Sequence, residues 1–450
     1  MFVNIIHKRG ENGVLKKLLL AVAAAITVGG ILPAAPASAK SYLTIASSSK
    51  TDYNARFNQS QRNDGIYYYG PYYTRRSAKT RDASGKNWQH RFVRVTETAT
   101  LSNGVTFAKF SWYGKSIGWV DQRALQKFSR SSNATALLNK AHFKGRAMLF
   151  NNYYTGSSRI SIGNADNSSQ TANGPTTLFP IASLQKVMTG AIIEQLASSH
   201  KLSLNDRLSK YYPSVANSQN ITLRQLLNHR SGISMSESTP NTVLTTQAAQ
   251  LNYTLQQLKA SSNQSYNYTN ANYTLLAAVA SKVAGQSYDS LVQDRIIKPL
   301  KLTNTYAWNN LPTSQMTASG YTFSNGQDYQ NAPVSQKLVS SLLGASNYYS
   351  TPEDYYTFQK GLRNGKVLTK SQYQDLADNG AYTYAGGMYH YSNGIKRDRG
   401  SLTGAGYDDL YYGTEGNKIG VILFANQEPS RSINSLGETL YDLARYYNEN

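Results

Sequence analysis

Residues 179–193 read FPIASLQKVMTGAII, a stretch that combines the pattern of a buried helix with two polar residues of a catalytic type. Its apolar side chains recur at helical spacing, at Ile181, Leu184, Met188, Ala191 and Ile192. Ser183 and Lys186 are three residues apart, a spacing that places both on the same side of a helix. An ordinary surface lysine beside a capping serine gives the same local pattern, so the rest of the chain has to separate the two interpretations.

The pair Ser183 and Lys186 fits nucleophilic catalysis. A serine hydroxyl is a weak nucleophile until a neighbouring base accepts its proton. The chain has only six histidines and none at a useful spacing, so lysine is the candidate base. Its reference pKa of about 10.4 falls by up to roughly 3–5 units when it is buried or placed near other positive charges. Ser183 stands near the N-terminus of the predicted helix, where free N–H groups favour developing negative charge.

Length and composition narrow the class of protein. A chain of 450 residues is long enough for two or three domains and a large core. It contains no cysteine, which excludes a disulfide framework and a thiolate metal site. It has no HExxH pattern, so we expect no metal centre and no other cofactor.

The first 39 residues have the layout of a secretory signal peptide. Lys8, Arg9, Lys16 and Lys17 precede the apolar run LLLAVAAAITVGGIL, and PAAPASA then supplies small residues that end at Ala39. That order is typical of a leader with an A-x-A cleavage site. The alternative is an uncleaved membrane anchor, because the apolar run is nearly long enough to span a bilayer. We therefore expect an exported protein that is secreted and associated with the cell wall.

The formal net charge is +21, and its distribution is uneven. Residues 40–130 hold 16 Lys and Arg against 5 Asp and Glu, a net of +11, whereas residues 131–450 hold 26 against 19. For an exported protein the polyanions within reach are teichoic acids, lipoteichoic acid and the membrane surface rather than nucleic acid. We expect the basic N-terminal part to contact such a polymer.

Residues 41–130 form the first predicted domain, a small all-β barrel of the SH3 type. Strand-like runs, YYYGPYYT, RFVRVTETATL, VTFAKFSWY and SIGWV, alternate with turn sequences such as DASGKN and SNG. The tyrosine-rich opening, SNGVTFAKFSW and the dipeptide Gly118–Trp119 resemble the GW modules of Gram-positive surface proteins. That resemblance implies attachment to the wall through lipoteichoic acid. Most of the tyrosines and Trp112 are expected to fill the core of this domain.

Residues 131–450 mix both periodicities and form the second predicted domain. Helical patterns cover 134–142, 183–199, 222–229, 271–284 and 435–448, and strand patterns occur in GRAMLFNNYY, AGGMYHY, LYYGT and KIGVILFAN. Strands at both ends of the segment, with helices concentrated between them, predict an α+β fold in which helices flank an antiparallel sheet.

A second polar segment, SYNYTNANYTLLAAVAS, carries Tyr268 and Asn270 just ahead of a predicted helix. The order SLQK, YTN and a strand with Thr-Gly resembles the penicillin-binding-protein and β-lactamase superfamily, and looks most like its class C β-lactamase and D,D-peptidase branch. Phrases such as TLFPIAS, KLSLNDRLSKYYP, ITLRQLLNHRSGI, IIKPLKLTNT, STPEDYYTF and GVILFANQ extend the resemblance over about residues 135–448. Within ITLRQLLNHRSGI, His229 is expected to serve structure.

The resemblance implies a role for each motif residue. Ser183 would form an acyl-enzyme, and Lys186 would assist its deprotonation. Tyr268 would relay protons to the leaving group and later activate water, and Asn270 would orient the substrate and Lys186. The backbone N–H groups of Ser183 and Ala405 would form the oxyanion hole.

One departure from the superfamily concerns its third motif. The superfamily has K-T-G or H-T-G there, and the cation contacts the substrate carboxylate. Here the substrate-binding phrase consists of Leu402, Thr403 and Gly404, so the cation is missing. Arg397 or Arg399 could supply the charge from another angle, or both are simply solvated.

These observations predict a secreted, wall-associated serine acyl hydrolase that acts on D-alanyl groups of the Gram-positive envelope. The groups would be peptide-linked, as in peptidoglycan stem peptides, or ester-linked, as on D-alanylated teichoic acid. Leu402 favours the ester, whose free group is an ammonium rather than a carboxylate. The alternative is a catalytically inactive wall-binding or adhesion protein with the same fold.

Overall fold

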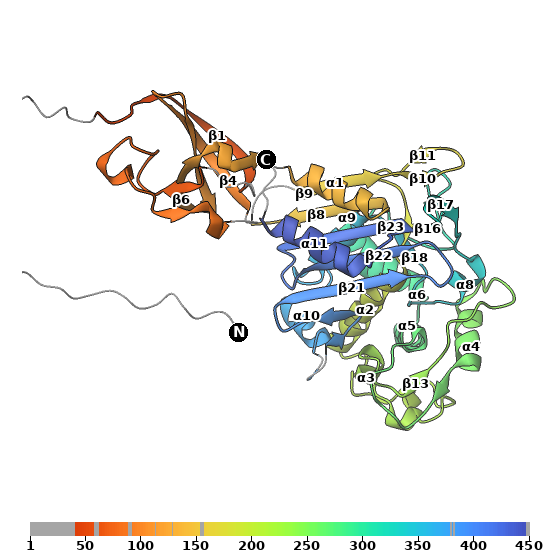
Figure 1. Cartoon of the computed structure of the whole chain (residues 1–450). Coiled ribbons are helices and arrows are strands. Elements are labelled where there is room, and N and C mark those ends of the chain that lie inside the picture. Colours follow the sequence, from red (N-terminus) through yellow and green to blue (C-terminus); the bar gives the residue numbers. More distant parts are fainter. Residues whose placement is uncertain are drawn as a thin grey trace, which may run out of the picture. The chain divides into compact units, whose positions relative to one another are not determined.

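The computed structural model describes residues 41–57, 63–88, 92–112, 114–127, 129–153, 157–378, 380 and 383–446 (Figure 1). The predicted signal peptide, residues 1–39, lies outside these ranges. Within them, no helix is both long and apolar enough to cross a bilayer. The described residues include an N-terminal all-β part and a mixed α and β part, each with its own hydrophobic core.

The N-terminal part is an antiparallel sheet, to which the described residues contribute seven strands. In sheet order these are β3 (Ala83–Ser84), β2 (Gly65–Tyr67), β6 (Lys115–Asp121), β5 (Thr106–Trp112), β4 (Phe92–Leu101), β1 (Ile45–Phe57) and β7 (Leu125–Lys127). Val95, Phe110 and Val120 are fully buried in its core. This architecture agrees with the all-β fold predicted for this part of the chain.

Two features of this sheet differ from the sequence pattern. The pattern does not predict β1, because residues 45–50 are exposed and scarcely alternate in polarity. That strand is held by its pairing with β4. Conversely, the run YYYGPYYT contributes only its first residue to β2, and the remainder forms turns. Tyr68, Tyr69 and Tyr72 are exposed there, so these three tyrosines do not fill the core.

The mixed part is built on a second antiparallel sheet. Its strands follow the order β9 (Ser157–Ile162), β8 (Lys144–Asn151), β23 (Ile419–Glu428), β22 (Asp408–Thr414), β21 (Ile395–Ser401), β20 (Met388–His390) and β19 (Tyr384–Ala385). A hairpin of β16 (Tyr321–Ser324) and β17 (Gln327–Asn331) extends it, with β16 parallel to the end of β23. The strand patterns at both ends of the segment therefore meet in one sheet, as predicted.

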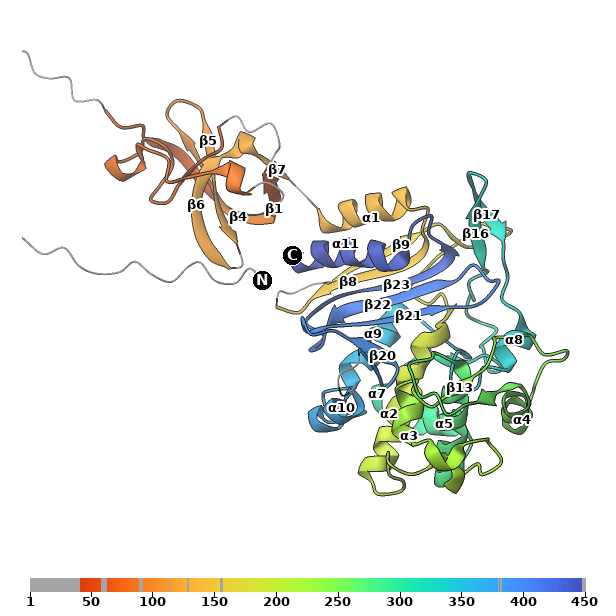
Figure 2. The same cartoon turned by 60° about the horizontal axis from the view of Figure 1, so that its bottom comes forward.

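Helices cover both faces of this sheet (Figure 2). One face carries α1 (Arg130–Lys140) and α11 (Ile433–Tyr446), and the other carries α2 (Lys186–Ser198), α5 (Asn270–Ala284) and α9 (Pro352–Gly361). Successive side chains of β23 face opposite sides of the sheet: Val421 and Leu423 pack with α11, whereas Ile422 and Phe424 pack with α2. This layering confirms the predicted α+β fold.

Shorter elements complete the mixed part. The helices are α3 (Leu223–Leu227), α4 (Gln247–Gln257), α6 (Tyr288–Val292), α7 (Lys298–Leu300), α8 (Gln336–Ser340) and α10 (Lys370–Leu376). The strands are β10 (Asn164–Asp166), β11 (Thr171–Ala172), β12 (Phe179–Pro180), β13 (Ile233–Ser234), β14 (Lys259–Ala260), β15 (Tyr306–Ala307) and β18 (Tyr348–Ser350).

Candidate active site

The segment that carries Ser183 is a 3₁₀ turn rather than the first turn of an α-helix. The turn spans Ala182–Gln185 and continues directly into α2, which begins at Lys186. Ala182 has a φ of +44°, a left-handed conformation that is unusual for a residue with a side chain. The helix predicted over 183–199 is thus confirmed except at its start, where Ser183 lies in the turn.

Strand β21 passes close to this turn because residue 400 is glycine. A Cβ atom at Gly400 would lie 2.7 Å from the carbonyl oxygen of Ile181 and 3.0 Å from the Cβ of Ala182. The absence of a side chain lets the two backbones approach. The strand and the turn that carries Ser183 are therefore in direct contact.

Lys186 is fully buried, and its amine contacts three groups. The Nζ atom lies 2.9 Å from Ser183 Oγ, 2.8 Å from Asn270 Oδ1 and 3.1 Å from the carbonyl oxygen of Ala345. An ammonium would donate to all three oxygens. A neutral amine would instead donate to Asn270 and Ala345 and accept the hydroxyl proton of Ser183. The contact with Ser183 therefore has the geometry of a base beside a nucleophile.

Burial lowers the pKa of Lys186 from 10.5 to about 7. The negative charges of Asp398 and Glu237 act in the opposite direction, because they favour the ammonium. Near neutral pH the amine is consequently divided between its two protonation states, which is the condition for a general base.

The second motif lies at the N-terminus of α5. Thr269 caps the helix by accepting a hydrogen bond from the backbone N–H of Ala271, and Asn270 follows with its amide turned to Lys186. Tyr268 precedes the cap, and its ring centroid lies 5.0 Å from Lys186 Nζ.

Tyr268 is a neutral phenol in this environment. Desolvation raises the pKa of its hydroxyl well above 10, although a hydrogen bond with Ser183 opposes the shift and 40% of the residue is exposed. A phenol can pass on a proton, whereas a resident phenolate base would need a lowered pKa. The electrostatics therefore favour Lys186 over Tyr268 as the first base.

His229 packs directly against Tyr268. The imidazole is fully buried, with its ring centroid 4.3 Å from that of Tyr268, and its Nδ1 accepts a hydrogen bond from Asn272 Nδ2 at 2.9 Å. Burial lowers the pKa of His229 well below 6.5, and the charge of Lys186 adds to the effect. A neutral ring held in this way supports the tyrosine, in agreement with the structural role expected for His229.

The third motif forms a turn after β21 and is not part of the strand. The N–H of Ala405 donates to the carbonyl oxygen of Leu402 at 3.0 Å, and Gly404 has a φ of +72°, as in a type II turn. The Ala405 N–H, expected in the oxyanion hole, is thus engaged within the turn in this structure. Thr403 and Gly404 are exposed, so the backbone of the turn can border a substrate.

The side chain of Leu402 belongs to the core. It is 3% exposed and shares an apolar cluster with Ala182, Leu338 and Val339. The residue that replaces the superfamily's cation is therefore a packing residue, and it supports the turn that carries Ser183.

Arg397 and Arg399 are both engaged by neighbouring side chains. Arg399 donates two hydrogen bonds to the buried carboxylate of Asp408, at 2.8 and 3.0 Å. The guanidinium of Arg397 lies 5.0 Å from the ring centroid of Tyr389 and 5.5 Å from that of Tyr391. These contacts give both charges partners other than a substrate at the third motif.

Glu237 is a site residue that the sequence motifs do not indicate. It is partly buried in the loop between β13 and α4. Its Oε2 accepts a hydrogen bond from Asn270 Nδ2 at 2.7 Å, and its Oε1 accepts one from the backbone N–H of Thr403 at 3.3 Å. A carboxylate thus connects the second and third motifs. Because the loop brings it there from a distant part of the chain, no local spacing could have identified it.

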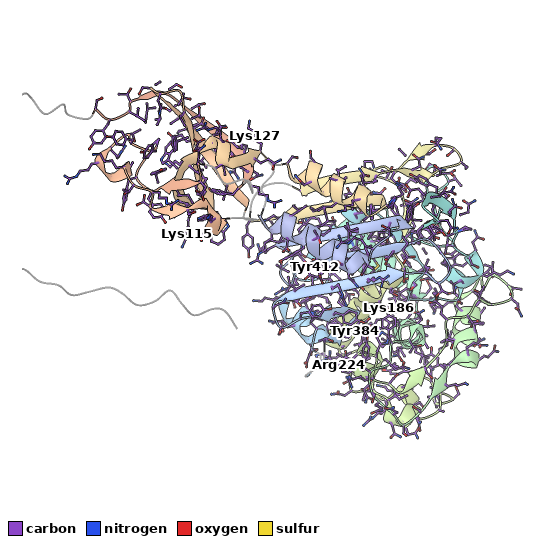
Figure 3. The ribbon with its side chains drawn as sticks, viewed as in Figure 1. Lys115, Lys127, Lys186, Arg224, Tyr384 and Tyr412 are labelled. Carbon is purple, nitrogen blue, oxygen red and sulfur yellow. The ribbon has the colours of Figure 1, made fainter. Side chains whose placement is uncertain are left out.

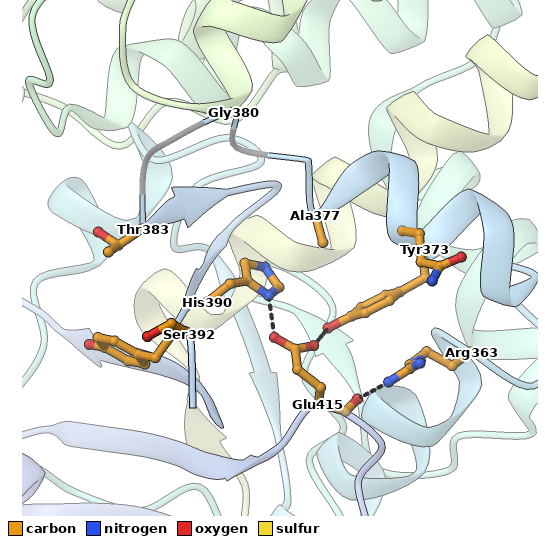
Figure 4. A pocket seen from close by; sticks show the side chains of 10 residues that line it. Arg363, Tyr373, Ala377, Gly380, Thr383, His390, Ser392 and Glu415 are labelled. Carbon is orange, nitrogen blue, oxygen red and sulfur yellow. Dashed lines mark hydrogen bonds and ion pairs between the residues drawn. The ribbon is translucent and has the colours of Figure 1, made fainter. Parts of the chain in front are cut away.

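A separate cavity of about 630 Å³ lies between α10 and β20 (Figure 4). Its polar groups largely satisfy one another: the Glu415 carboxylate accepts hydrogen bonds from His390 Nδ1 at 2.6 Å and from the Tyr373 hydroxyl at 2.8 Å. Arg363 donates to the backbone carbonyl of Glu415. None of the motif residues lines this cavity, which distinguishes it from the candidate active site.

Two family models match the chain. The model described as Beta-lactamase covers residues 140–444, and the model of the GW (Gly-Tryp) dipeptide domain covers residues 47–126. These ranges correspond to the mixed part and to the N-terminal sheet.

Curated relatives include two proteins of Gram-positive bacteria. PbpX of Bacillus subtilis, which carries the name of a penicillin-binding protein, is 26% identical over 347 residues, or 77% of this chain and 86% of PbpX. A teichoic acid D-alanine hydrolase of Staphylococcus aureus is 31% identical over 205 residues. That second match spans 45% of this chain and about half, 48%, of the hydrolase.

Solved structures share the fold of the mixed part. FmtA from Staphylococcus aureus has a TM-score of 0.62 at 23% identity, and the match covers 70% of this chain and 89% of FmtA. The D-amino acid amidase from Ochrobactrum anthropi has a TM-score of 0.60 at 20% identity, with 70% of this chain and 99% of the amidase covered.

Proposed function

Because the chain belongs to the beta-lactamase family, we propose that it is a serine acyl hydrolase that removes D-alanyl groups from polymers of the Gram-positive cell envelope. The observation that carries this proposal is the 2.9 Å contact between the buried amine of Lys186 and Ser183 Oγ. The name of one relative, the teichoic acid D-alanine hydrolase of Staphylococcus aureus, supports the class of acyl group.

In the proposed reaction, Ser183 Oγ attacks the carbonyl carbon of the acyl donor while its proton passes to the neutral amine of Lys186. The bond from the acyl carbon to the polymer oxygen then breaks, and the proton moves through Tyr268 to the leaving alkoxide. Water attacks the acyl-enzyme in the second half of the reaction, gives up its proton along the same route, and releases free D-alanine as Ser183 regains its hydrogen. Of the two N–H groups expected in the oxyanion hole, that of Ser183 stabilises the oxyanion, whereas that of Ala405 is bound to the carbonyl oxygen of Leu402.

The surroundings of the third motif favour an ester over a peptide as substrate. A stem peptide that ends in D-Ala–D-Ala has a carboxylate beside the scissile bond, and desolvating that charge without a partner is costly. Leu402 is buried in an apolar cluster, and Arg399 is bound to Asp408. A D-alanyl ester on teichoic acid carries an ammonium instead and does not need the missing cation.

We propose further that the protein is secreted and that its N-terminal sheet holds it on an anionic wall polymer such as lipoteichoic acid. The match to the GW model and the net charge of +11 over residues 40–130 support this assignment. Exposed cations of the loops include Arg75 and Arg76. Lys115 and Lys127, on strands of the sheet, are exposed as well and are labelled in Figure 3.

The direct test measures free D-alanine released from lipoteichoic acid and, separately, from a stem pentapeptide by the chain without residues 1–39. We expect release from lipoteichoic acid and little from the peptide. Ser183→Ala should abolish release and leave thermal unfolding unchanged, because the hydroxyl contributes little packing. Undiminished hydrolysis by Ser183→Ala would contradict the proposal, and failure of the unmodified protein to react with a fluorophosphonate probe would favour the inactive wall-binding alternative.

A further inference from the structure

Glu237 takes no part in the acyl-transfer steps proposed above, yet its carboxylate lies beside the groups that perform them. A chain of short contacts leads to it from the nucleophile: Lys186 to Ser183 at 2.9 Å, Lys186 to Asn270 at 2.8 Å, and Asn270 to Glu237 at 2.7 Å. We propose that Glu237 binds the ammonium group of the D-alanyl donor and thereby selects α-aminoacyl esters as substrates. This inference rests on the proposed function.

The carboxylate has the capacity for such a contact. Each carboxylate offers about four acceptor positions. The described partners of Glu237 occupy two of them, one from Asn270 and one from Thr403. The residue is only partly buried, so a ligand in the site can reach it. These two donors also fix the carboxylate in place before a substrate arrives.

The covalent structure of the donor matches this position. In an α-aminoacyl ester the ammonium is two bonds from the carbonyl carbon that Ser183 attacks. A donor whose carbonyl lies at Ser183 Oγ therefore keeps its ammonium inside the site, and an ammonium turned toward Asn270 meets the carboxylate of Glu237. A charged hydrogen bond there would be about twice as strong as a neutral one.

The charge balance of the site points in the same direction. The superfamily's third motif has a cation, whereas here the N–H of Thr403 in that motif is bound to a carboxylate. The nearest cation in the chain of contacts is Lys186, whose active form is neutral. The site therefore attracts an ammonium and disfavours a substrate carboxylate.

The alternative role for Glu237 is purely structural, in which it braces the loop between β13 and α4 against the third-motif turn. Loss of a brace would disturb Asn270 and Lys186 and would slow the hydrolysis of every ester alike. Loss of an ammonium site would affect only donors that carry an ammonium. A ratio of activities therefore separates the two roles.

The experiment compares Glu237→Gln, Glu237→Asp and the unmodified protein on two soluble donors, D-alanyl glycerol ester and propionyl glycerol ester. The propionyl ester differs from the D-alanyl ester only in that a hydrogen replaces the ammonium on the α-carbon. In Glu237→Gln we expect the ratio of kcat/KM for the D-alanyl ester to that for the propionyl ester to fall roughly tenfold to a hundredfold. Glu237→Asp should recover part of the ratio, because it keeps the charge.

A β-lactam that carries a carboxylate tests the same site with the opposite charge. In Glu237→Gln the ratio of its acylation rate to that of the propionyl ester should rise, because the repelling carboxylate of Glu237 is gone. Glu438→Gln, an exposed carboxylate on α11, is the matched control and should leave both ratios unchanged. An unchanged D-alanyl to propionyl ratio in Glu237→Gln would overturn the inference. Failure of the unmodified protein to hydrolyse the D-alanyl ester would instead overturn the proposed function.

Discussion

Lys186 depends on its burial for the chemistry proposed for it. The side chain is fully enclosed at the start of α2, and the loss of hydration brings its pKa to about 7 against the attraction of Asp398 and Glu237. A surface lysine with the same spacing from a serine would stay protonated and could not accept a proton. The decisive property is thus the environment and not the residue type.

This environment predicts a pH dependence. Only the neutral amine of Lys186 can accept the proton of Ser183, so the rate of acylation should rise about tenfold per pH unit below pH 7 and level off above it. Labelling by a fluorophosphonate probe at each pH gives the rate. Lys186→Ala should lower the plateau by about 10²–10⁴-fold and remove the inflection, whereas Lys201→Ala, on the exposed loop after α2, should change neither. A rate that is constant between pH 6 and pH 8 would contradict this role.

Leu402 is the second residue whose environment changes its interpretation. Leu402→Lys places an amine in the apolar cluster with Ala182 and Leu338, so we expect it to lower the free energy of unfolding by about 2 kcal/mol or more and to reduce ester turnover. Thermal unfolding and D-alanine release measure the two effects. Leu402→Met conserves volume and should cost less than about 1.5 kcal/mol. A Leu402→Lys protein of unchanged stability that hydrolyses stem peptide would mean that this side chain faces the substrate.

At the scale of elements, the position of Ser183 depends on the contact between its 3₁₀ turn and β21. Gly400→Ala introduces a Cβ atom 2.7 Å from the carbonyl oxygen of Ile181, so either the strand or the turn has to move. We expect a loss of about 1–3 kcal/mol in the free energy of unfolding. We also expect the rate of acylation to fall by a larger factor than the fraction of folded protein does.

The matched control is Gly416→Ala, in the exposed turn between β22 and β23. The nearest atom to a Cβ there is 3.7 Å away, which is ordinary van der Waals contact, so this variant should retain both stability and acylation. Calorimetry and labelling by the fluorophosphonate probe provide the comparison. Equal behaviour of the two variants would show that the close approach of β21 is unimportant for the nucleophile.

At the scale of the whole molecule, the charge is concentrated in the N-terminal sheet and its loops. Binding of a polyanion by such a surface weakens as salt increases, through screening and counterion release. We expect the Ser183→Ala chain to bind lipoteichoic acid at low salt and to release it at high salt. Replacement of Arg75, Arg76 and Arg81 by Gln should weaken binding and flatten its dependence on salt, as measured by co-sedimentation with the polymer.

Three exposed lysines of the mixed part, Lys201, Lys337 and Lys370, form a matched control of equal charge. Their replacement by Gln should change binding much less than the loss of the three arginines. The opposite result would assign the contact with the polymer to the mixed part of the chain.

Much of the fold could be predicted from local sequence. The helices predicted over 183–199 and 271–284 lie almost entirely in the core, and each is encoded by consecutive apolar and small residues that recur at helical spacing. The motif segments SLQK and YTN were identifiable because their order along the chain resembles that of the penicillin-binding-protein and β-lactamase superfamily. The placement of strand patterns at both ends of residues 131–450, with helical patterns between them, was enough to predict the layered architecture.

Tertiary contacts decide the remaining features. Strand β1 is polar over much of its length and is held by its pairing with β4. The third motif is a turn because the N–H of Ala405 donates to the carbonyl oxygen of Leu402. Glu237 reaches Asn270 from a separate loop. The burial, the pKa and the hydrogen-bond partners of a side chain depend on residues far apart in the chain. The periodicity of a local segment carries no information about these contacts. Local sequence therefore predicts the candidate nucleophile and base, whereas the carboxylate of Glu237 beside Asn270 becomes visible only in the folded protein.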